Sequence, residues 1–180
     1  MNILHNRGGA WRWLGISLVV IALDQWTKQF IMQHFTEFEF VTVLPVLQIT
    51  RLHNLGAAFS FLADESGWQR TFFIALASAV SLGILVWLLQ LPRRGNGMLS
   101  PGLALVLGGA LGNLIDRVRL GYVVDFIHAH WEGAYFPAFN VADSAITVGA
   151  VFLLLDALMD AGRKPAEPKL PESKAAEPKT

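Results

Sequence analysis

Residues 71–92 read TFFIALASAVSLGILVWLLQLP, and no Asp, Glu, Lys or Arg occurs among them. A second charge-free run, GNGMLSPGLALVLGGALGNLI, covers residues 95–115. A helix of about 20 apolar residues crosses the roughly 30 Å hydrocarbon core of a bilayer, so each run is long enough to span a membrane. Two further apolar runs contain or adjoin charged residues. We therefore predict an all-α membrane protein with four transmembrane helices, near residues 13–33, 70–91, 98–116 and 141–161.

The composition agrees with this class of protein. Of the 180 residues, 53% are hydrophobic and 16% are charged, and the mean hydropathy is +0.44. Soluble domains carry about 25% charged residues, so this chain is short of solvating side chains. Lys+Arg 14 against Asp+Glu 14 leaves no net charge, which gives no support to a nucleic-acid-binding surface. The absence of cysteine excludes a disulfide framework, thiolate metal ligation and a cysteine nucleophile.

Lysine and arginine are distributed unevenly over the predicted loops. Nine of them lie before the first span, in the 92–97 loop or after the last span, whereas four lie in the two opposite loops. The positive-inside rule then predicts that both termini are cytoplasmic and that residues 35–69 and 117–140 face the outside. No small-residue cleavage site follows the first span, so we interpret it as an uncleaved helix. Residues 163–180 are rich in Pro, Lys, Glu and Ala, and we expect a disordered cytoplasmic tail after a single domain over 1–162.

The outer segment at residues 36–62 has the composition of short strands. Residues 38–43 and 46–50 are rich in β-branched and aromatic side chains and are separated by Pro45. We expect two strands that form a small β-rich platform at the membrane surface. Residues 54–58 then present small side chains, where the backbone of another chain could approach closely. A simple interfacial loop is the alternative.

Polar residues inside the predicted spans each need an explanation, because a charge there costs at least ~2.5 kcal/mol on insertion scales. Asp24 and Lys28 are four residues apart on one helix face and can pair. We favour a structural ion pair over a substrate or proton site. Asn113 and Arg117 share a face at the outer end of the third span, where Arg117 either snorkels to the interface or holds carbonyl or carboxylate oxygens. Close helix packing is expected at the glycines of that span, Gly108 and Gly112.

Two acidic residues lie at apolar boundaries. Asp125 occurs in the strand-like run VVDFI, and Asp143 lies where the fourth span begins. Helix capping, with Asn140 as the N-cap, explains Asp143 but leaves Asp125 without a reason. Two apposed carboxylates can hold one proton between them. The ionised member takes a proton from water while the protonated member hydrogen-bonds a scissile carbonyl, which is the chemistry of an aspartic protease.

Other functions would use the same polar residues. His128 and His130 could be half of a metal site, but no third ligand is evident, and histidines in an interfacial aromatic belt are the favoured interpretation. We therefore predict no metal and no other cofactor. A proton-coupled transporter would place its ionisable residues in broken or repeated helices, whereas here they gather at one face. A non-catalytic scaffold explains the packing glycines but not the apposed acids.

Five short motifs resemble, in order, those of the lipoprotein signal peptidase (signal peptidase II) family. They are DQxTK at 24–28, NxGAAF at 54–59, GNxxDR at 112–117, VDF at 124–126 and FNxAD at 139–143. The resemblance implies a four-span aspartic endopeptidase of the bacterial cytoplasmic (inner) membrane, with its active site at the outer face. Such enzymes remove signal peptides from prolipoproteins, and they cut before a cysteine that already carries diacylglycerol.

The resemblance also implies roles for individual residues. Asp125 and Asp143 would be the catalytic dyad, and Asp24 and Lys28 would be supporting residues. The strands at 38–52 would form the platform over which the substrate lies. Membrane lipids and cyclic peptide inhibitors such as globomycin are expected partners besides the lipid-modified prolipoprotein. The residues implied to bind substrate are Asn54, Gly56, Asn113, Arg117 and Asn140.

Overall fold

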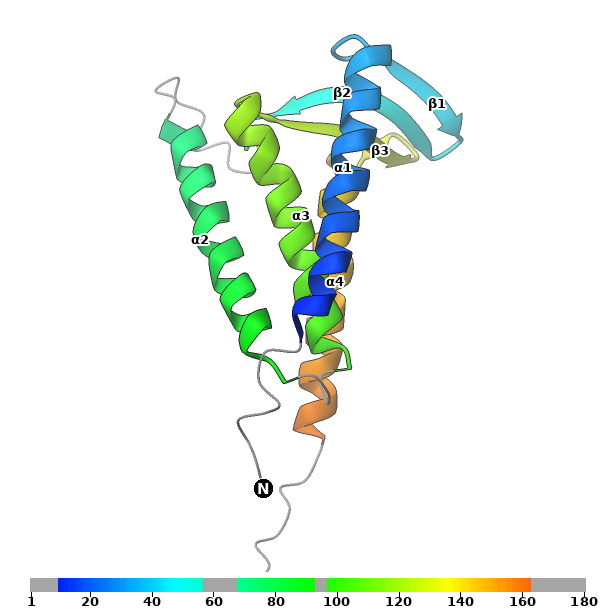
Figure 1. Ribbon diagram of the computed structural model, residues 1–180. Coiled ribbons are helices and arrows are strands. Elements are labelled where there is room, and N and C mark those ends of the chain that lie inside the picture. The colour runs from blue at the N-terminus through cyan, green and yellow to red at the C-terminus, as the bar shows by residue number, and fades with distance from the viewer. Residues whose placement is uncertain (1–9, 57–67, 93–96, 163–180) are drawn as a thin grey trace, which may run out of the picture.

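The structure is a computed structural model that describes residues 10–56, 68–92 and 97–162. Four long helices dominate it (Figure 1), and a 3-10 turn, η2 (Ala10–Trp13), leads into the first. The helices closely match the four predicted spans, except that the third continues almost one turn beyond residue 116. Their bounds are α1 (Leu14–His34), α2 (Trp68–Gln90), α3 (Leu99–Arg119) and α4 (Val141–Ala161).

Three of the helices in the described part of the chain, α2, α3 and α4, are long and apolar enough to cross a membrane. The remaining predicted span, α1, is a helix of 21 residues, the same length as α3 and α4. It falls outside this group because Asp24, Gln25 and Lys28 lower its mean hydropathy. A transmembrane position for α1 is therefore still a prediction.

Helix α3 is the centre of the bundle, since it contacts α1, α2 and α4. Glycines allow these close approaches. A Cβ added to Gly108 would lie 2.8 Å from Cβ of Val20 in α1, and one added to Gly109 would collide with the carbonyl oxygen of Ala142 in α4. The expected packing role of the glycines is confirmed at Gly108. Gly112 likewise faces α1, since a Cβ added there would lie 2.6 Å from Oδ2 of Asp24.

The outer surfaces of the helices are apolar. In α2 only Ser81 and Leu88 are buried, and leucine, valine and aromatic side chains cover the rest of the helix. In α4 the buried residues are Ala142, Ala145 and Gly149, whereas Leu154, Leu158 and Met159 are among its exposed apolar side chains. Water would solvate such surfaces poorly, so these helices suit a hydrocarbon environment.

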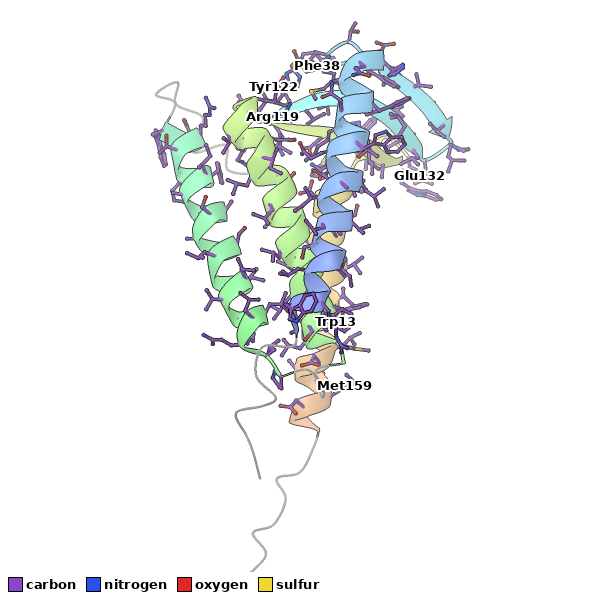
Figure 2. The ribbon with its side chains drawn as sticks, in the orientation of Figure 1. Trp13, Phe38, Arg119, Tyr122, Glu132 and Met159 are labelled. Atoms are coloured by element: carbon purple, nitrogen blue, oxygen red, sulfur yellow. The ribbon has the colours of Figure 1, made fainter. Side chains whose placement is uncertain are left out.

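A four-stranded antiparallel sheet lies at one end of the helices (Figure 1), in the order β1-β2-β3-β4. The two strands predicted around Pro45 are confirmed, and the strand-like run around Asp125 belongs to a third strand. The fourth strand was not predicted. Phe38, Tyr122 and Glu132 lie at the sheet end of the molecule, and Trp13 and Met159 lie toward the other end (Figure 2). The strand bounds are β1 (Phe40–Leu44), β2 (Leu47–Asn54), β3 (Val123–Trp131) and β4 (Ala134–Tyr135).

Strand β3 joins the sheet to the helices. Val124 and Phe126 are buried in an apolar cluster with Ile31 of α1. Because side chains alternate along a strand, Asp125 points to the opposite face, away from this cluster. The sequence VVDFI thus anchors β3 against α1 on one side and presents a carboxylate on the other. The predicted disorder of residues 163–180 concerns residues outside the described part of the chain.

Candidate active site

Asn140 connects the two acidic residues that the sequence analysis paired. Its side-chain amide donates a 2.7 Å hydrogen bond to Oδ1 of Asp125, and its backbone N–H donates a 3.2 Å bond to Oδ2 of Asp143. The side-chain oxygen of Asn140 in turn accepts a 2.9 Å bond from the backbone N–H of Asp143, which completes a capping box at the start of α4. Helix capping and the pairing of the acids are therefore not alternatives here, because one residue does both.

Asp125 is held at both carboxylate oxygens. Asn54, the last residue of β2, donates a 2.8 Å hydrogen bond to Oδ2, while Asn140 occupies Oδ1. The side chain is buried, and burial together with the nearby charge of Asp143 raises the pKa of Asp125 from its ordinary value to about 6, against the lowering effect of the two amide donors. Asp125 thus retains a proton more readily than an exposed carboxylate.

Asp143 is held through α3. The side-chain amide of Asn113 donates a 2.8 Å hydrogen bond to Oδ1 of Asp143. The oxygen of the same Asn113 amide accepts a 2.8 Å bond from Nζ of Lys28 in α1. A continuous series of polar contacts therefore runs from α1 through α3 to the first turn of α4. The orientation of the Asn113 amide is fixed because donor and acceptor are both used.

Lys28 lies at the centre of a buried ionic cluster. Its ammonium group is 2.8 Å from Oδ2 of Asp24 and 3.0 Å from Oδ2 of Asp116. Asp24 also accepts from the backbone N–H of Ala142 at 2.9 Å, and Asp116 accepts from the backbone N–H of Val124 at 3.1 Å. The cluster thus contacts the residues immediately before both Asp143 and Asp125. The predicted Asp24–Lys28 pair is present, with α3 contributing a third member.

The sequence analysis assigns no role to Asp116, which occurs there only within the GNxxDR motif. Its position three residues after Asn113, on the same side of the helix, is the signal that the sequence offers. Gln25, which donates a 2.8 Å hydrogen bond to Oδ1 of Asp116, was likewise not singled out.

Gly56 and Arg117 lie on the side of the site that α2 covers. The guanidinium of Arg117 lies over the ring of Phe73 in α2, 5.2 Å from its centroid, and within electrostatic reach of Asp125 and Asp143. Gly56 has φ +103 and donates its backbone N–H to Oδ1 of Asn54 at 2.8 Å. Neither residue bonds the carboxylates directly, so both differ in placement from Asn54, Asn113 and Asn140.

The histidines considered as half of a metal site contact an aromatic ring. His128 and His130 have ring centroids 4.9 Å and 5.2 Å from that of Tyr135. Within residues 10–56, 68–92 and 97–162, no group of three or more His, Cys, Asp or Glu is arranged to hold a metal ion. The contacts of His128 and His130 with Tyr135 agree with the interpretation that these histidines belong to an aromatic belt.

Comparison with known proteins extends over most of the chain. The family described as Signal peptidase (SPase) II matches residues 16–159. A lipoprotein signal peptidase of Acinetobacter baumannii is 56% identical over 144 residues, which cover 80% of this chain and 81% of that protein. A lipoprotein signal peptidase of Pseudomonas aeruginosa is 54% identical over 153 residues, which cover 84% of this chain and 90% of that protein.

A solved structure has the same fold. It is a bacterial membrane enzyme determined by the in meso method at 2.3 Å resolution, and it superposes with a TM-score of 0.77. The sequence identity is 30%, and the match covers 90% of this chain and 96% of that one. The helices and the sheet thus belong to a fold already known for a membrane enzyme.

Proposed function

Because the chain belongs to the signal peptidase II family, we propose that it is an aspartic endopeptidase of bacterial prolipoproteins. It removes the signal peptide by cutting before a cysteine that carries diacylglycerol. The observation that supports this most strongly is the sharing of Asn140 by the two acids, at 2.7 Å from Asp125 and 3.2 Å from Asp143. An N-cap needs only the contacts between Asn140 and Asp143. The additional hydrogen bond from the Asn140 amide to Asp125 is not required for capping.

The two acids differ in environment, which supports different roles in the reaction. Asp125 is buried, and its raised pKa means that it retains a proton more readily than an exposed carboxylate, so it is the member that donates a hydrogen bond to the scissile carbonyl oxygen. Asp143 is half-buried and accepts from Asn113 and from the backbone of Asn140, and it acts as the base. The dyad holds one proton in total, and its titration belongs to the pair.

The proposed reaction needs only these two groups and water. Asp143 takes a proton from water as the water oxygen bonds to the carbonyl carbon, while Asp125 gives its proton to the carbonyl oxygen. In the second step the C–N bond breaks, Asp143 gives its proton to the leaving amine nitrogen and the hydroxyl proton returns to Asp125. The products are a carboxylic acid and an amine, and the dyad regains its single shared proton.

The remaining polar residues orient these groups and the substrate. Asn54, Asn113 and Asn140 hold the carboxylates, and Gly56 holds Asn54 through its backbone N–H while its lack of a side chain admits the ring of Phe73. Arg117 offers a fixed guanidinium near the dyad, suited to hold a substrate carbonyl oxygen. Asp24 accepts a hydrogen bond from the first turn of α4, and Lys28 pairs with Asp24. Both residues therefore position α4 and take no part in the chemistry. The sheet is the platform on which the substrate lies.

The protein is an integral membrane protein of a bacterium, and we propose the cytoplasmic membrane, with both termini cytoplasmic and α1 as a fourth span. The dyad then lies at the outer interface, where water is available as the nucleophile. The acyl chains of the substrate partition into the bilayer with ~0.8 kcal/mol per buried CH₂, which holds the cut site at this depth. Cyclic peptides such as globomycin would compete for the same site.

The test is cleavage of a diacylglyceryl-modified prolipoprotein by the purified full chain in the presence of a metal chelator. Wild type is compared with Asp125→Asn, Asp143→Asn and Asp160→Asn, the last being an exposed carboxylate at the far end of α4. We expect cleavage before the lipidated cysteine by wild type and Asp160→Asn alone. Substantial turnover by either dyad variant removes that residue from the mechanism, and loss of activity with chelator contradicts the metal-free reaction.

A further inference from the structure

An apolar groove of about 330 Å³ lies between the sheet and the outer end of α1. Aromatic and aliphatic side chains form its walls, and the single hydroxyl among them, on Thr27, is already bonded to the carbonyls of Leu23 and Asp24 at 2.8 Å and 2.9 Å. The groove therefore offers no polar group to a ligand. Its lining residues are Trp26, Thr27, Phe30, Ile31, Phe35, Val41, Val43, Ile49 and Phe126.

Strand β3 separates this groove from the catalytic dyad. Phe126 contributes to the groove wall, whereas the adjacent Asp125 points to the other face of the strand and bonds Asn54 and Asn140. A chain attached to the substrate cysteine at the dyad would have to pass around β3 to enter. The groove is thus a second site, behind the catalytic strand.

The groove continues the outer apolar surface of α1. Val19, Leu23, Trp26 and Phe30 recur at the spacing of one helix face, and all are exposed, Trp26 by 66% and Phe30 by 47%. The last two also line the groove. In Figure 1, β1 and β2 extend sideways beyond the helices on the side of α1, so the apolar stripe leads beneath the sheet.

We propose that the groove binds one acyl chain of a bilayer phospholipid, which runs along the α1 stripe and ends its path against Phe126. An acyl chain matches a site with an apolar lining, since it brings no donor or acceptor that would lose its partner. Within a membrane it is also the most concentrated molecule of this shape, and mass action favours its occupancy. A bound chain supports β3, and hence Asp125, from behind. This inference rests on the proposed transmembrane position of α1 and not on the proposed peptidase chemistry.

The test uses the full chain in vesicles of phosphatidylethanolamine and phosphatidylglycerol that contain a trace of phosphatidylethanolamine with a diazirine in one acyl chain. After irradiation, adducts are mapped by peptide mass spectrometry. We expect more adducts on the groove residues than on Leu154, an exposed residue of α4 outside the groove. Val43→Trp should lower the groove adducts roughly fivefold, the ratio for about 1 kcal/mol of binding.

Leu44→Trp is the matched control. Val43 and Leu44 are adjacent in β1 and similarly exposed, at 56% and 53%, but only Val43 lines the groove. Leu44→Trp should leave the groove adducts unchanged. Val43→Thr, which keeps the shape of valine and replaces one methyl group with a hydroxyl, provides a second variant should the tryptophan disturb the sheet, and its adducts should also fall.

Three outcomes overturn the proposal. Groove adducts that do not exceed those on Leu154, or that respond equally to Val43→Trp and Leu44→Trp, mean that there is no specific site. Loss of the adducts when a diacylglyceryl-modified substrate is added assigns the groove to substrate. Groove adducts that fall as the protein-to-lipid ratio is raised assign it to a second copy of the chain. Failure of prolipoprotein cleavage leaves all these lipid readouts unchanged.

Discussion

The carboxylate of Asp24 in α1 accepts a 2.9 Å hydrogen bond from the backbone N–H of Ala142, in the first turn of α4. The first N–H groups of a helix have no intrahelical acceptor, and the helix dipole favours negative charge beside them. Asp24 is also paired with Lys28 at 2.8 Å. The start of α4, and with it Asp143, is therefore positioned by a charged residue of the first helix.

Replacing Asp24 should be strongly destabilising. Asp24→Ala removes an acceptor from Ala142 and one of two anionic partners from Lys28, which is 1% exposed. Breaking a buried ion pair from one side costs about 3–5 kcal/mol. We expect a clear fall in the thermal midpoint in detergent, which Lys28→Met in the same chain partly restores. Asp160→Asn, on the exposed end of α4, should leave the midpoint unchanged. Equal midpoints for Asp24→Ala and wild type would refute a supporting role for Asp24.

Asn140→Ala should impair the reaction more than binding. The substitution frees an oxygen of Asp125, removes the cap of α4 and allows the two acids to shift relative to each other. A misplacement of about 1 Å costs on the order of 10² in rate, so kcat should fall by that factor while KM changes little. Ser144→Ala removes only a hydroxyl bonded to the carbonyl of Asn140 and is the control. The prediction fails if Asn140→Ala and Ser144→Ala have the same kcat in steady-state kinetics.

Gly56→Ala should inactivate for two separable reasons. The backbone at φ +103 costs a residue with Cβ about 1–2 kcal/mol, and the new methyl would collide with the ring of Phe73. Because Gly56 bonds Asn54, the collision displaces a donor of Asp125, and we expect at least a roughly tenfold loss of kcat.

Gly133→Ala separates these two effects. Gly133 has φ +84 with nothing within 4 Å of an added Cβ, so it carries the backbone cost alone and should retain activity. Phe73→Leu combined with Gly56→Ala should recover part of the loss. Inactivation by Gly133→Ala, with no recovery in the double variant, would show that the ring contact is irrelevant.

Arg117→Ala tests whether the guanidinium holds substrate. A charge-assisted hydrogen bond contributes about 1.5–3 kcal/mol, so kcat/KM should fall by roughly tenfold or more. Arg119→Ala, two residues further along α3 and exposed (Figure 2), should behave as wild type. Unchanged kinetics for Arg117→Ala would mean that the guanidinium does not bind substrate and that the side chain only packs on Phe73 and extends to the membrane interface.

Asp125 should make the protein less stable as the pH rises through the acidic range. Its pKa is about 6 in the folded protein against 3.8 ordinarily, so between these values the folded state binds more protons than the unfolded state. Stability from this group is therefore present at low pH and declines between about pH 4 and 6, by up to about 3 kcal/mol. Thermal midpoints measured across this range should decline less steeply for Asp125→Asn than for wild type or Asp160→Asn. Parallel slopes in all three would contradict the raised pKa.

The local features of the fold could be predicted from the sequence. The helices follow from apolar runs of membrane-spanning length, and the strands on either side of Pro45 follow from their β-branched composition. The N-cap at Asn140 is a pattern within four residues. Helix α1 differs from the other three, because its hydropathy alone does not identify it as a span. The charged residues that lower this hydropathy, Asp24 and Lys28, are the ones that contact α3 and α4.

The tertiary contacts of the site needed the structure. The pairing of Asp125 with Asp143 could be inferred because an acid in an apolar strand has few explanations. Nothing local indicates that Asp116 contacts Lys28, which belongs to another helix. The contact of Gly56 with Phe73 was equally inaccessible, because Phe73 is an ordinary apolar residue of α2 in the sequence.

The spacing of Asp24 and Lys28 bears on how the protein is made. On the proposed topology, in which α1 is a fourth span, the ribosome delivers α1 to the membrane well before α3, so Asp116 has not been synthesised when Lys28 first enters. The two opposite charges of α1 are one turn apart and neutralise each other as soon as that turn forms. Lys28 therefore has Asp24 as its counter-ion from the start. When α3 is inserted later, Asp116 replaces water beside an ion pair that has already formed.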